Sequence, residues 1–63
     1  MSVAKQVREA AELMVKLHGE EAPMEASVKT LELLRAGEVE RALIWLRIMV
    51  TSKSLLAREI ATT

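Results

Sequence analysis

His18 is the only histidine in the chain, and three glutamates, Glu20, Glu21 and Glu25, follow it closely. An imidazole beside carboxylates is the arrangement that a general base or a metal site would use. One imidazole and three long, mobile glutamates do not make a closed ligand set, however, and Gly19 directly follows His18. A histidine that ends a helix, near the negative end of the helix dipole, explains this pattern better. We therefore expect no catalytic residue, no metal site and no cofactor.

The other polar residues form no catalytic pattern. The 63-residue chain has no cysteine, its serines and threonines have no histidine and acid at a spacing that would activate them, and its two glycines do not form a phosphate-binding loop. We expect a protein that is not an enzyme.

Basic residues are frequent from position 41 onward, where four of them stand against Glu59 alone. Arg47 and Arg58 fall on one side of a helix, whereas Arg41 and Lys53 point in other directions, so one chain has no continuous basic stripe. The total of nine basic and nine acidic residues also argues against a nucleic-acid partner. A small nucleic-acid-binding regulator, in which a dimer pairs the Arg47/Arg58 stripes, is the alternative function.

Apolar residues recur at steps of three and four along the chain, a spacing typical of amphipathic helices. Gly19 and Gly37 end two of these patterns, because glycine readily adopts the left-handed conformation after a last helical turn. Both connections are short, which favours antiparallel neighbours. The sequence predicts one all-α domain, residues 1–63, made of an antiparallel helical hairpin plus a longer third helix, with helices at about 3–18, 21–36 and 38–60.

The predicted helix 21–36 has two apolar sides. We expect the larger side to face the core, and the smaller side, Ala26 with Leu33, is either a second interface or a minor surface feature. The larger side consists of Met24, Ser27, Val28, Leu31 and Leu34.

The most continuously apolar stretch is 42–50, which only Arg47 interrupts. On a helix, its apolar residues cover most of the circumference, as in helices that are buried from several directions. The stretch is too short to span a bilayer, which takes about 20 residues. It also lacks the large lysine-rich face of a membrane-surface helix. The sequence therefore predicts that this stretch is buried against other protein segments and that the chain has no membrane partner.

A chain of this size can hardly be stable alone, because apolar burial and ordering entropy nearly cancel. Because the chain has no cysteines for disulfides and no expected metal site, association with partners must supply the missing stability. We expect a homodimer or, as the second choice, a tetramer, and the sequence does not identify a heterologous partner. The predicted self-association interface comprises Leu43, Ile44, Trp45, Leu46, Ile48, Met49, Leu55, Leu56 and Ile60.

Two resemblances accompany these predictions. The segment 37–42, Gly-Glu-Val-Glu-Arg-Ala, resembles the inter-helix turn of a tetratricopeptide repeat, in which an alanine five residues after a glycine lets the helices approach. This resemblance covers about residues 28–50 and implies a helical hairpin. It does not imply the peptide groove of that family, because no second copy follows.

The chain also resembles a group of short, uncharacterised bacterial helical proteins. The resemblance lies in the His18-Gly19 turn and in the Gly37-Glu38 turn that leads to Trp45 and Arg47. It implies a bacterial origin and no particular activity.

The N-terminal segment 1–9 carries charges where a signal peptide would need an apolar core, and the lack of cysteine fits a reducing compartment. We therefore expect a cytoplasmic protein. The predicted role is a protein–protein interaction or scaffold module that self-associates through the third helix.

Overall fold

The computed structural model describes the backbone of residues 2–62 and the side chains of residues 2–59. It contains the helices α1 (Val3–His18), α2 (Ala22–Arg35) and α3 (Val39–Thr62), with a short 3-10 turn, η1 (Gly19–Glu21), between the first two. No strand occurs within this part of the chain. The predicted all-α fold is confirmed, and every predicted helix boundary lies within two residues of the observed one.

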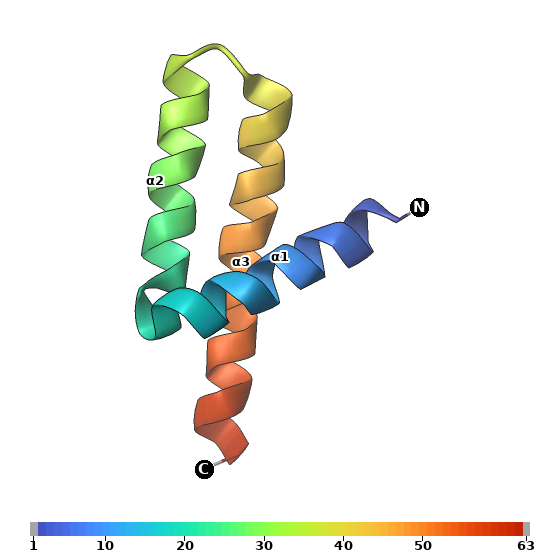
Figure 1. The fold of residues 1–63 in the computed structure, drawn as a ribbon, viewed down its shortest axis with the longest axis vertical. Coiled ribbons are helices and arrows are strands. Elements are labelled where there is room, and N and C mark those ends of the chain that lie inside the picture. The colour runs from blue at the N-terminus through green and yellow to red at the C-terminus, as the bar shows by residue number, and fades with distance from the viewer. Residues whose placement is uncertain (1, 63) are drawn as a thin grey trace.

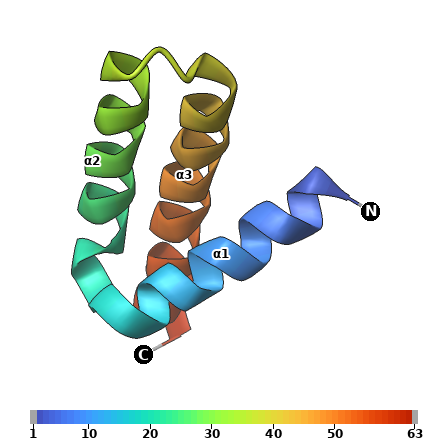
Figure 2. The ribbon, with the colours of Figure 1, turned by 45° about the horizontal axis from the view of Figure 1, so that its top comes forward.

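The helices α2 and α3 form a long antiparallel hairpin, and α1 lies across one side of it (Figures 1 and 2). The lower part of α3 continues past α1 (Figure 1). Antiparallel packing of consecutive helices is therefore confirmed for α2 and α3 but wrong for α1 and α2. The chain turns at Gly19, with φ 57° and ψ −131°, and passes directly through η1 into α2, so it does not double back along α1.

The turn between α2 and α3 depends on Gly37, which has φ 80°. Its amide donates to the carbonyl of Leu34 at 3.0 Å, and the amide of Glu38 donates to the carbonyl of Leu33 at 2.9 Å. These two bonds are the Schellman motif, which satisfies carbonyls that a helix end would otherwise leave unpaired. The positive φ predicted for Gly37 is confirmed.

Gly37→Ala should destabilise the protein by about 1 kcal/mol, because an alanine at positive φ is strained. Gly37→Asn should cost less, since asparagine tolerates the left-handed conformation. Urea denaturation of the three proteins at one concentration measures both changes. An alanine variant with the wild-type midpoint would mean that the two helices are joined differently.

Small side chains fill the contact between the three helices. Ala11 of α1 and Ala26 of α2 are fully buried, and they form a cluster with Val7 of α1 and Ile48 of α3. The largest described side chain with less than 2% of its surface exposed is Ser52. Among the residues whose side chains are described, four of the seven buried apolar ones are alanines, and no large apolar side chain has less than 2% of its surface exposed.

Two buried side-chain hydroxyls lie in this interior, and both are hydrogen-bonded. Thr30 donates to the carbonyl of Ala26 at 2.9 Å, and Ser52 donates to the carbonyl of Ile48 at 2.8 Å. Because each hydroxyl bonds back to its own helix, neither helix needs a polar partner across the contact. Their small volume, like that of alanine, allows close packing.

The face of α2 that lies in the core is the opposite of the one predicted. Ala22, Ala26, Thr30 and Leu33 are buried, whereas the larger apolar side is exposed. The distance between two packed helices depends on the side chains at the contact, and alanine and threonine allow α2 to lie close to α3. The exposed large residues are Met24, Val28, Leu31 and Leu34.

Candidate association surface

Large apolar side chains lie on the outside of the hairpin formed by α2 and α3. Four of them belong to α2 and are 45–62% exposed, and four on one side of α3 are 41–57% exposed. A fifth exposed residue of α3, Ile44, lies on another side of that helix. Single exposed apolar residues are common on proteins, whereas extended patches mark interaction sites. We call the following eight residues the hairpin surface: Met24, Val28, Leu31, Leu34, Val39, Leu43, Leu46 and Val50.

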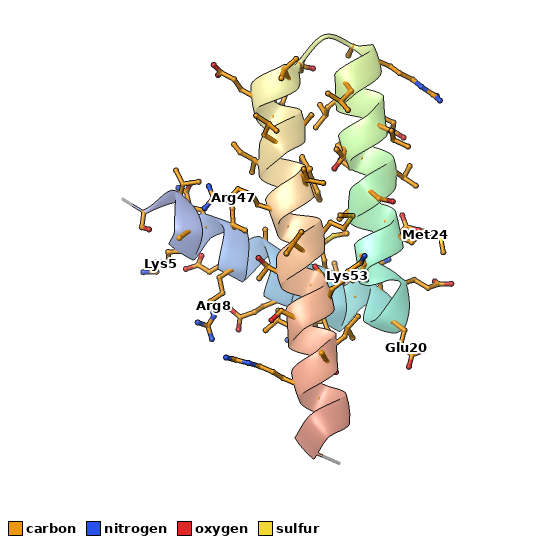
Figure 3. All side chains as sticks on the ribbon, turned by 180° about the vertical axis from the view of Figure 1, so that it is seen from behind. Lys5, Arg8, Glu20, Met24, Arg47 and Lys53 are labelled. Carbon is orange, nitrogen blue, oxygen red and sulfur yellow. The ribbon has the colours of Figure 1, made fainter. Side chains whose placement is uncertain are left out.

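The four residues of α3 lie on one line, because they follow one another at steps of four, three and four. At 100° per residue this line is centred about 170° around the helix from Ile48. Ile48 is buried against Val7 and Ala11 of α1. The line therefore points away from α1, toward the side of the hairpin that Figure 3 presents, where α1 lies behind α3.

The total exposed area supports an unfilled interface. The chain exposes 4768 Å², whereas a compact folded chain of 7.0 kDa is expected to expose about 4,000 Å². The excess is roughly 750 Å², close to the roughly 800 Å² that each partner contributes to a standard protein–protein interface. This excess belongs to the whole chain: besides the hairpin surface, Val3, Leu13 and Leu17 of α1 are also exposed.

The structure divides the predicted self-association residues into three groups. Leu43 and Leu46 lie on the hairpin surface, and Ile44 is exposed on another side of α3. Ile48 is buried within the chain, Trp45, Met49 and Leu55 pack against its cluster, and Leu56 is half-buried. The side chain of Ile60 lies outside the described residues. Whether any of these residues contacts another chain stays a prediction.

Sequence reasoning did not place Val39, Val50 and the α2 residues in an interface. The signal for Val39 and Val50 was available, because the four-three-four spacing continues through Leu43 and Leu46 to both ends of the apolar stretch. The α2 residues were identified as an apolar face but were assigned to the core. Their exposure shows that the hairpin surface extends over two helices.

His18 is exposed at the end of α1, where it and Lys16 are the basic residues of the last turn. Across the described residues, no three histidines, cysteines or acids gather as a metal site would require. A groove of about 470 Å³ between α1 and α3 is lined by Lys16, Leu55 and Arg58, among others, and does not include His18. Within the described residues the imidazole therefore lies outside any cluster of three potential metal ligands.

His18→Ala should leave folding nearly unchanged and cost at most about 1 kcal/mol, through the lost interaction with the end of the helix dipole. Thermal unfolding at one concentration measures this cost, and elemental analysis of both proteins checks for metal. A metal that the wild type binds and the variant lacks would contradict the structural role of His18.

Basic side chains do not gather on α3. Arg47 and Lys53 project from opposite sides of the helix (Figure 3). Arg58 lines the groove together with the acids Glu12 and Glu59, so its surroundings carry mixed charge. The nucleic-acid alternative therefore gains no specific observation in its favour and stays a prediction.

No helix within the described residues is both long and apolar enough to cross a membrane. Comparison of the chain with protein-family models, curated proteins and solved structures gave no match.

Proposed function

We propose that the protein is a protein–protein interaction module, with a scaffold role, that self-associates through the hairpin surface with α3 at its centre. The observation that carries this proposal is the exposure of the eight large apolar side chains of the hairpin surface, on a chain in which four of the seven buried apolar residues described are alanines. A second copy has the same apolar surface, so pairing covers the exposed apolar side chains of both chains at once.

The free energy gained by burying this surface is of the order that association costs. Burying the exposed half of a leucine or valine contributes about 1 kcal/mol, so sixteen such side chains in a dimer contribute on the order of 15 kcal/mol. The loss of translational and rotational freedom costs about 4–15 kcal/mol. The two estimates leave between about 0 and about 11 kcal/mol in favour of a dimer.

The concentration dependence of the thermal midpoint tests this proposal. If only the associated chain is stable, mass action raises the apparent stability by about 1.4 kcal/mol per tenfold increase in concentration for a dimer. Circular dichroism at 222 nm follows the helices of the wild-type chain through this series. A midpoint that stays constant over a hundredfold dilution would contradict the proposal.

A further inference from the structure

We infer that two copies pair about a single twofold axis that sets α3 antiparallel to α3 of the second copy. In this arrangement Leu43 of one copy lies opposite Leu46 of the other, and Val39 lies opposite Val50. The inference rests on the proposed function and adds that a second copy covers the hairpin surface in a defined, antiparallel orientation. It would fail separately if the chains associate in another orientation.

The exposed line of apolar residues on α3, which we call the α3 line, has the same order of residue types in both chain directions. Its residues are Val39, Leu43, Leu46 and Val50, with the two leucines in the middle and a valine at each end. An antiparallel copy therefore presents a leucine to each leucine and a valine to each valine. Such a self-complementary patch is what a twofold interface requires, since the same surface is used by both partners.

Charges beside the line favour the antiparallel orientation over the parallel one. Glu40 and Arg47 are both exposed and flank the line on the same side, at about 90° and 70° from its centre. Parallel pairing about a twofold axis would place these two residues of one copy on the opposite side of the contact from those of the other copy, so they could not pair. Antiparallel pairing brings Arg47 of one chain within two residues, about 3 Å along the axis, of Glu40 of the other. Opposite charges beside an interface favour the correct orientation.

The surface of α2 is centred on the same level of the hairpin. The midpoint between Val28 and Leu31 and the midpoint between Leu43 and Leu46 each lie seven to eight residues from Gly37, the turn. Because α2 and α3 are antiparallel (Figures 1 and 2), the two midpoints are level. A twofold axis that lies in the interface and is perpendicular to α3 at this level therefore also relates the two α2 helices at the same level.

The arrangement also leaves α1 outside the interface. Because α1 packs on the Ile48 side of α3, it lies on the outer side of each hairpin in the pair. The interface then centres on the two α3 helices, one from each copy. The excess exposed area of roughly 750 Å² per chain matches the roughly 800 Å² per partner that a standard interface buries.

Cysteine cross-linking tests the orientation, because the chain has no cysteine of its own. Val39→Cys and Val50→Cys variants are mixed in equal amounts, unfolded and refolded together so that the copies exchange, and oxidised. In the antiparallel pair, position 39 lies opposite position 50, whereas two copies of position 39 are about 16 Å apart along the axis. A disulfide requires Cα atoms within about 7 Å. The 39–50 cross-link should therefore be the major product by peptide mass spectrometry.

Ile44→Cys is the matched control, because Ile44 is exposed on α3 but lies away from the line. It should form no disulfide-linked dimer under the same conditions. Predominance of 39–39 and 50–50 cross-links would overturn the antiparallel pairing and leave self-association intact. A dimer by sedimentation that cross-links at neither position would overturn the use of this surface. A folded monomer without cross-links would overturn both the inference and the proposed function.

Discussion

Replacing Leu43 and Leu46 together by glutamate should convert the associated protein into a monomer. Both side chains are about half exposed in the single chain, so a carboxylate there remains hydrated while the chain is alone. In a dimer, four carboxylates would lie in the centre of an apolar contact, where burying an unpaired charge costs several kcal/mol. We expect the association constant to fall by more than about 1,000-fold.

Ile44→Glu is the control for this variant. Ile44 is 42% exposed and Leu46 is 41% exposed, but Ile44 lies on a different side of α3. The control should keep the wild-type mass in size-exclusion chromatography with light scattering, while the double variant loses it. A double variant that retains the wild-type mass would show that the hairpin surface is not the contact.

Ile48→Ala should give the largest loss of stability among single truncations in the chain, about 2–5 kcal/mol. Ile48 is only 4% exposed and belongs to the cluster that joins the three helices. Its truncation leaves a cavity where α1 contacts α3. If the protein unfolds as a dimer, the change is made twice in each unfolding unit, so the variant could be unfolded at micromolar concentration.

Trp45 fluorescence measures this loss, because Trp45 packs against the same cluster. The matched control is Ile44→Ala, a truncation on the same helix at an exposed position, which should change stability by at most about 0.5 kcal/mol. Equal effects of the two substitutions would mean that α1 does not cover Ile48.

The helices could be predicted from the sequence because their ends have local causes. Gly19 and Gly37 are the only glycines in the chain, and both have the positive φ that a glycine after a helix adopts. The crossing of α1 could not be predicted in this way. It depends on the ψ of Gly19 and on the fit of alanines across three helices, and neither has a periodic signal in the sequence.

The face of α2 was predicted wrongly for a physical reason. Hydrophobic periodicity shows which face avoids water, but not whether the same chain or a partner covers that face. On α2, Ala26 permits a close approach within the chain, so the larger residues, such as Leu31, are left outside. A core that depends on small side chains is therefore hard to recognise from apolar periodicity alone.

The candidate surface could be predicted in part. Leu43 and Leu46 were expected to associate and do lie on the hairpin surface, whereas Ile48 lies in the core of the chain. The stretch 42–50 is apolar nearly all around, so its sequence does not distinguish the side facing α1 from the side facing outward. The structure supplies that distinction by placing Val7 and Ala11 on Ile48.

The central claim is that this chain associates with its own copy, and the mass of the wild-type protein in solution tests it most directly. Sedimentation equilibrium from about 1 to about 100 μM covers the range of ordinary dimer affinities. The proposal predicts a mass of twice the 7.0 kDa chain at the upper end, falling on dilution together with the helical signal. A fully folded 7.0 kDa monomer at every concentration would contradict it.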